Sequence, residues 1–112
     1  MISKDLVAAS ATPMVLSILS QGENYGYALI QRVRELSSGQ MEWTDGMLYP
    51  VLHRLERQGL VRSRWRVSDV GRKRKYYSLT ERGGGFLRQS RKQWMVVHST
   101  LAKLWEEAPC LT

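Results

Sequence analysis

Residues 44–60, TDGMLYPVLHRLERQGL, decide the fold of this chain. Four apolar residues of the stretch fall at i, i+3, i+4 and i+7, on one stripe of an α-helix: Leu48, Val51, Leu52 and Leu55. The residues facing away from that stripe are mostly aromatic or basic: Tyr49, Pro50, His53, Arg54 and Arg57. Thr44 is a good N-cap residue, and Gly59 is placed to end the helix. The stretch therefore predicts a helix with one core face and one aromatic and basic face.

Tyr49 and Pro50 lie near the start of this helix. Proline inside a helix removes a hydrogen bond, so Pro50 predicts an irregular first turn within a single helix. An exposed Tyr-Pro pair is not needed for packing and indicates a surface that contacts another molecule. Tyr49 could equally cover the neighbouring helix, and the residues alone leave both readings open.

Length and composition indicate one globular domain. The 112 residues are 43% hydrophobic and 24% charged, without a long apolar run or a leader-like segment, so we expect a cytoplasmic protein and no membrane partner. Cys110 is the only cysteine, and His53 and His98 are the only histidines. We therefore expect no internal disulfide, no metal site and no cofactor.

Positive charge is concentrated in the second half of the chain. The formal net charge is +7, and residues 54–92 hold 13 of the 17 Lys and Arg residues against three acidic ones. A basic concentration beside a helix with an aromatic and basic face is typical of a nucleic-acid binder, although a charged run is more often only a solvated face. Because this run spans several elements, we favour nucleic acid.

Three helical segments precede that basic region. Residues 4–11 predict one or two helical turns, and Thr12-Pro13 predicts the start of a buried helix. Asn24 can cap the next helix, from Tyr25 to about Leu36, with an inward stripe of Tyr25, Leu29, Val33 and Leu36. The helix of residues 44–60 follows, which gives the helix-turn-helix arrangement.

The period then changes from helical to alternating. Residues 61–67 alternate arginine with other side chains and predict a half-buried strand with its basic side outward. Residues 68–71 supply a turn, and residues 72–79 return as a second strand. The pair predicts a hairpin with basic residues at its tip, which is the wing of a winged helix.

The last predicted element is a long helix from about Glu81 to Glu107, capped by Thr80. Gly83, Gly84 and Gly85 weaken its first turns, so we expect a start that frays or hinges. Apolar residues then recur at heptad spacing: Leu87, Trp94, Val97, Leu101, Leu104 and Ala108. A helix of about 40 Å cannot bury such a seam on a small domain, so we expect it to pair with a second copy. The alternative is that the seam packs along its own domain.

Four motifs carry a family likeness: YGY at 25–27, GMLYPVLHRLE at 46–56, GLV at 59–61 and GRKRKYYSLTERG at 71–83. With them, residues 12–105 resemble the PadR family of bacterial transcriptional regulators, and the single C-terminal helix resembles the compact members. The resemblance implies a homodimer that represses a nearby promoter. The sequence departs from the family pattern in its triple glycine at 83–85, where the family usually has one glycine.

The predicted fold is mostly α with a small β-hairpin, a winged helix-turn-helix followed by a long C-terminal dimerisation helix. Residues 1–80 form the DNA-binding domain, with residues 1–12 as a short helix docking on the dimer, and residues 81–112 form the dimerisation helix. The expected DNA-binding residues are Tyr49, His53, Arg54, Arg57, Arg72, Lys73, Arg74 and Lys75. The expected dimer interface is Leu87, Trp94, Val97, Leu101 and Leu104.

The predicted partner is a near-palindromic double-stranded operator, with phosphate contacts giving affinity and groove contacts giving specificity. In some compact relatives a tryptophan at a position like Trp94 stacks on a flat aromatic effector, so Trp94 either binds such an effector or is plain interface core. Two rival functions are a sequence-indifferent DNA-coating protein and a winged-helix module that docks a protein. An enzyme is not expected, because no catalytic constellation accompanies the two histidines.

Overall fold

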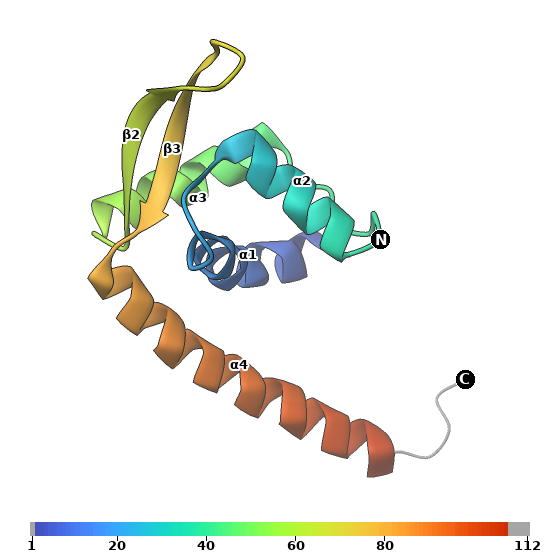
Figure 1. Cartoon of the computed structure of the whole chain (residues 1–112). Coiled ribbons are helices and arrows are strands. Elements are labelled where there is room, and N and C mark those ends of the chain that lie inside the picture. The colour runs from blue at the N-terminus through green and yellow to red at the C-terminus, as the bar shows by residue number, and fades with distance from the viewer. Residues whose placement is uncertain (1, 108–112) are drawn as a thin grey trace.

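The computed structural model describes residues 2–107, which form a helical body with a small sheet and a long last helix (Figure 1). The elements in chain order are α1 (Lys4–Leu19), β1 (Asn24–Tyr25), α2 (Gly26–Leu36), α3 (Asp45–Arg57), β2 (Val61–Val67), β3 (Lys73–Leu79) and α4 (Glu81–Glu107). The β2–β3 hairpin lies at one end of the molecule, and the C-terminal half of α4 lies at the other. The predicted winged helix-turn-helix with a long C-terminal helix is confirmed.

The N-terminal helix differs from the prediction. Residues 4–11 and the segment after Thr12 form one continuous helix, α1, which contains Pro13. Ser3 caps this helix, and its side chain accepts a hydrogen bond from the Leu6 N–H. A proline inside a helix costs about 3 kcal/mol. The continuous helix buries Ala11, Val15, Leu16 and Leu19 on one side, which offsets that cost. The separate short helix of residues 1–12 was therefore wrong.

The start of α2 also differs. Asn24 does not cap α2. Together with Tyr25 it forms the short strand β1, which pairs with β3 in the register Asn24 to Tyr77 and Tyr25 to Tyr76. The free edge of β3 offers hydrogen-bond partners to the backbone of these two residues, and these strand hydrogen bonds replace a side-chain cap. At the other end of α2, Leu36 is 64% exposed rather than inward as predicted, while Leu29 and Val33 are buried.

Helix α3 follows the sequence closely. The Thr44 hydroxyl accepts the Met47 N–H at 3.2 Å, and Leu48, Leu52 and Leu55 are fully buried. Gly59 has φ of +75° and ends the helix in a Schellman motif, in which the Leu60 N–H donates to the Leu55 carbonyl at 3.0 Å. The helix is continuous through Pro50, so the predicted single helix is confirmed.

The sheet has the order β1-β3-β2 and is antiparallel throughout. In β2 the alternation predicted from the sequence is confirmed, with Arg62, Arg64 and Arg66 on one face. Val61, Ser63 and Trp65 lie on the other face, opposite Leu79, Tyr77 and Lys75 of β3. At the base of the hairpin this second face joins the core through Val61 and Tyr77, and farther out it faces solvent.

The junction between the wing and α4 is closely packed. The Thr80 hydroxyl accepts the Gly83 N–H at 3.0 Å and donates to the Gly59 carbonyl at 2.7 Å, which confirms the cap. Gly83 is buried, and a Cβ there would overlap the carbonyl oxygen of Leu60. The start of α4 is therefore packed and not frayed or hinged as expected from the glycines. Gly83 permits the backbone of α4 to approach the backbone at Leu60 closely.

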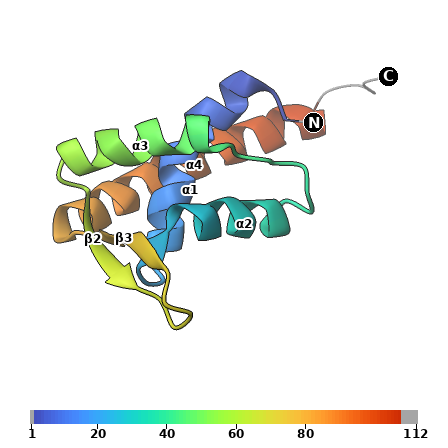
Figure 2. The same cartoon turned by 90° about the horizontal axis from the view of Figure 1, so that it is seen from above.

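Helix α4 runs past α1 and then extends beyond the body (Figures 1 and 2). Leu87 is buried in the core of its own domain, so it does not lie on the exposed part of the predicted seam. Trp94, Val97, Leu101 and Leu104 are exposed, and Ala108 lies outside the described residues. None of the helices in residues 2–107 is long and apolar enough to cross a membrane.

Candidate nucleic-acid interface

Helix α3 is fixed by its buried stripe, so its remaining side chains are presented at defined positions. Tyr49 leans toward α2, where a Cβ on Gly26 would come within 2.5 Å of its hydroxyl oxygen. A side chain at position 26 would therefore displace the Tyr49 ring from this place. Tyr49 still keeps 36% of its surface exposed, so it both covers α2 and remains accessible to a partner. His53 lies one turn later, with its ring centroid 6.5 Å from that of Tyr49.

Tyr49 and His53 line a cleft between α3, the start of α2 and the wing. This helix–wing cleft has a volume of about 680 Å³ and also includes Trp65 of β2 and Tyr77 of β3. All four basic wing residues predicted to bind DNA line it as well: Arg72, Lys73, Arg74 and Lys75. The structure thus brings six of the eight predicted DNA-binding residues to one cleft.

The two arginines of α3 do not line this cleft. The Arg54 guanidinium donates a hydrogen bond to the Thr12 hydroxyl at 2.8 Å, which holds this side chain over α1. Arg57 is exposed at the end of α3 and makes no hydrogen bond or ion pair with another side chain among residues 2–107. The outer surface of α3 therefore presents Arg57 free and Arg54 already engaged.

Aromatic rings hold the wing cations in place. The Lys73 ammonium lies 5.4 Å from the centre of the Trp65 ring, and the Arg74 guanidinium 4.2 Å from that of Tyr25. Lys75 lies 5.7 Å from the Tyr77 ring, where burial raises the pKa of the phenol and keeps it neutral. Such cation–π contacts reduce the entropy that a flexible side chain loses on binding.

The face of the wing that carries Arg74, opposite to Trp65, also holds an ion-pair cluster that the sequence did not predict. Glu23, in the turn before β1, accepts hydrogen bonds from Arg64 at 2.9 Å and from Arg66. The Arg64 hydrogen bond lowers the pKa of the Glu23 carboxyl, and the same contact raises the pKa of Arg64. Glu23 is 41 residues from Arg64 in sequence, so only the fold brings them together. The alternating arginines of β2 were the one available signal that a counter-charge was needed.

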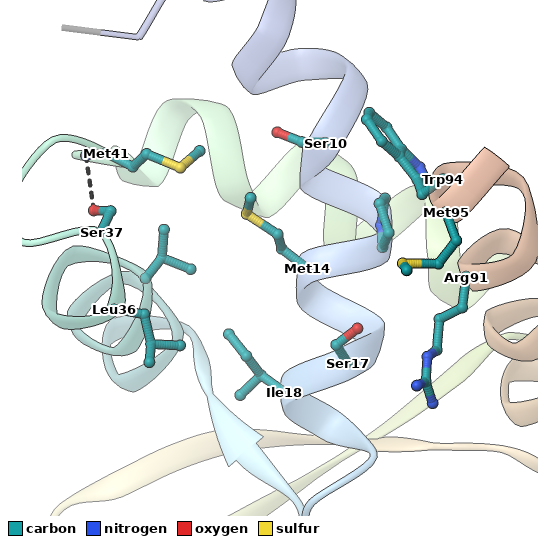
Figure 3. A pocket seen from close by; sticks show the side chains of 12 residues that line it. Ser10, Met14, Ser17, Ile18, Leu36, Ser37, Met41, Arg91, Trp94 and Met95 are labelled. Atoms are coloured by element: carbon teal, nitrogen blue, oxygen red, sulfur yellow. Dashed lines mark hydrogen bonds between the residues drawn. The ribbon is translucent and has the colours of Figure 1, made fainter. Parts of the chain in front are cut away.

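A second cavity, of about 560 Å³, lies on the side of α1 that faces α4 and α2 (Figure 3). Its walls are mostly apolar and include Met14 and Ile18 of α1, Leu36 of α2, and Trp94 and Met95 of α4. Figure 3 shows the Trp94 ring and the Met95 side chain on the α4 side of this cavity. Trp94, the predicted effector residue, therefore has an apolar cavity beside it within a single chain.

The chain of α3, basic wing and long last helix matches a known family. Residues 15–89 match the family model described as "Transcriptional regulator PadR-like family". The chain belongs to the PadR family.

Individual relatives and solved structures agree with this membership. The chain is 40% identical over 78 residues to a transcriptional regulator of Mycobacterium tuberculosis, a match covering 70% of this chain and 69% of that protein. It is 35% identical over 80 residues to the transcriptional regulator YqjI of Escherichia coli, covering 71% of this chain but only 37% of that longer protein. Among solved structures, a PadR-like transcriptional regulator of Bacillus cereus superposes with a TM-score of 0.83 at 28% identity, covering 94% of this chain and all of that one.

Membership in the PadR family makes this chain a DNA-binding transcriptional regulator and not an enzyme. Within residues 2–107 no three His, Cys, Asp or Glu side chains are grouped so that they could hold a metal ion. The basic and aromatic side chains of α3 and the wing converge on the helix–wing cleft.

Proposed function

We propose that this PadR protein is a homodimeric, sequence-specific repressor of a nearby promoter in the cytoplasm. The observation that carries the proposal is the convergence of Tyr49 and His53 with four wing cations on one cleft, at the end of the molecule remote from the exposed part of α4. One end then binds DNA while the other is free to pair with a second copy. Repression follows because a dimer bound across a promoter occludes it.

In the proposed complex α3 enters the major groove. Tyr49, His53 and Arg57 face the base edges, where arginine pairs with guanine O6 and N7. Arg54 contacts the DNA from its place over α1, beside the same groove. The wing residues Arg72, Lys73, Arg74 and Lys75 follow the backbone and the adjacent minor groove, and they supply the sequence-independent part of the affinity.

The proposed dimer forms through α4. Its apolar seam of Trp94, Val97, Leu101 and Leu104 is between 37% and 56% exposed in one chain, which is unusual for residues of this size at heptad spacing. Pairing two such helices buries the seam and relates the two reading helices by a two-fold axis. The operator is then near-palindromic, with half-sites about 10 bp apart or a multiple of that.

An effector site at Trp94 is the second part of the proposal. The cavity beside Trp94 is apolar and of the size that small flat molecules occupy. Its walls come from α1, α2 and α4. If α4 can adopt two positions relative to α1, a ligand that binds one position more tightly than the other shifts the spacing of the two α3 helices in the dimer. A planar aromatic dye, added without DNA, tests this site. Binding should be lost in Trp94→Ala and kept in Trp105→Ala, and equal binding by both variants would leave Trp94 as interface core.

The test of the DNA function is a selection of bound sequences from random duplex DNA at near-physiological salt. A two-fold symmetric motif is the expected result and gives the operator to search for near the gene. Tight binding without a motif would instead support a DNA-coating protein. The absence of binding to any duplex, with or without the dye, would support a module that docks a protein.

A further inference from the structure

The proposed DNA contacts leave several aromatic side chains of the cleft unused, and the largest of them is Trp65 on β2. Trp65 is 60% exposed and lies on the same face of the wing as Lys73 and Lys75, pairing with Lys75 across the hairpin. It also lines the helix–wing cleft together with Tyr49 and His53 of α3. Trp65 is not part of the core, which ends nearer the base of the hairpin, at Tyr77.

Trp65 is part of an apolar strip that continues to the wing tip. Val67 follows it on the same face of β2 and is 67% exposed, and Val70 in the turn is 83% exposed. Basic residues border this strip on the opposite strand, and the Lys73 ammonium is held over the Trp65 ring. An apolar strip bordered by cations fits a polyanion in which negative charges flank an apolar surface. A DNA groove has this pattern, because its deoxyribose walls lie between the phosphates.

We propose that Trp65 is a DNA-contacting residue that reads the shape of the minor groove beside each half-site. With α3 in the major groove, the wing lies over the adjacent minor groove, and the Trp65 ring packs on the deoxyribose wall while Lys73 neutralises a neighbouring phosphate. Groove width depends on sequence, so this contact makes affinity depend on bases that α3 does not touch. The inference rests on the proposed DNA function and adds a residue and a mode of recognition to it.

The chain offers a matched control for this residue. Trp105, on the last turn of α4, is 61% exposed, almost the same fraction as Trp65, but lies at the opposite end of the molecule from the wing. Trp65→Ala and Trp105→Ala therefore remove the same side chain from equally exposed sites. Because Trp65 is not in the core, the variant should fold, and its circular dichroism spectrum and thermal midpoint should match those of the parent.

The first measurement is affinity for duplexes with a fixed central motif and varied flanks. Trp65→Ala should lose about tenfold in affinity for the preferred flank and reduce the flank preference to about twofold, while Trp65→Phe keeps most of both. Discrimination within the central motif should stay unchanged, because α3 reads it. Trp105→Ala should bind like the parent.

The second measurement observes the ring directly. In protein labelled with 5-fluorotryptophan, the ¹⁹F resonance of Trp65, assigned through Trp65→Phe, should shift on adding the selected duplex, while that of buried Trp43 should not. If the duplex binds but the Trp65 resonance stays in place and Trp65→Ala keeps its flank preference, the inference is wrong and the DNA function stands. If no duplex binds at all, the proposed function fails, and the inference with it. A Trp65 resonance that shifts with protein concentration instead of DNA would assign the strip to contacts between copies.

Discussion

Replacement of Gly83 by alanine should destabilise the protein, whereas the same replacement at Gly84 should stabilise it. Both glycines lie in the first turn of α4, where alanine is preferred by about 1 kcal/mol. A Cβ at Gly83 would overlap the Leu60 carbonyl oxygen and approach Leu79 Cδ1 to 2.8 Å. A Cβ at Gly84 would meet only ordinary contacts, the nearest being Arg88 Nη1 at 3.8 Å.

The magnitude follows from what can move. The Leu60 carbonyl belongs to the backbone and also accepts the Thr80 N–H at 3.1 Å, so it cannot turn away as a side chain would. Relief needs a shift of α4 against the wing, and overpacking of this kind costs about 3 kcal/mol, the upper end of its usual range. The helix-propensity gain is common to both variants. We therefore expect Gly83→Ala to be about 2 kcal/mol less stable than the parent and Gly84→Ala about 1 kcal/mol more stable.

Urea denaturation of the parent and both variants, at one protein concentration, measures this difference. A fixed concentration is needed because dissociation of a dimer would contribute to the unfolding free energy. Thermal midpoints should follow the same order, separated by roughly 4 °C for each kcal/mol. Equal stability of Gly83→Ala and Gly84→Ala would refute the close approach of α4 to Leu60 and would favour the hinged start that the glycines suggest.

Three further predictions test other parts of the molecule. Arg57→Ala should reduce discrimination between operator and random DNA by about 1–3 kcal/mol, whereas Lys75→Ala should weaken all duplexes alike in a binding titration; a uniform loss from Arg57→Ala would show that Arg57 contacts phosphate only. Leu101→Asp should sediment as a monomer while Ser99→Asp, on the opposite side of α4, should remain a dimer, and a dimeric Leu101→Asp would remove the seam from the interface. Because pairing with Arg64 and Arg66 depresses the pKa of Glu23 below its ordinary value of 4.5, the stabilisation is present at neutral pH and lost as pH falls through the folded pKa. The urea midpoints of the parent and Glu23→Gln should therefore differ at about pH 7 and converge once the pH falls below the lowered pKa of Glu23, and a difference independent of pH would exclude the ion pairs as its cause.

The elements defined by local rules could be predicted from the sequence. The stripe of Leu48, Leu52 and Leu55, the Thr44 cap and the Gly59 terminus define α3, and each acts within a few residues of chain. Alternation in residues 61–67 defined the wing in the same way, and the charge of residues 54–92 indicated nucleic acid. Helical period and the hairpin pattern, both readable from the sequence, predicted the DNA-binding residues of α3 and of the wing. Only the packing of the wing beside α3 brings six of the eight to one cleft.

Contacts between distant segments were decided only by the tertiary structure. Pro13 signalled a helix start, but burial of Ala11, Val15 and Leu16 along one side of α1 outweighed the lost hydrogen bond. Asn24 predicted a helix cap, but its backbone pairs with the free edge of β3 as part of strand β1. Arg54 bound to Thr12, Glu23 between two wing arginines, and Gly83 against Leu60 each join residues more than 20 positions apart. Local sequence carries no information on such pairings, because their energy exists only once the chain has brought both partners to the same place.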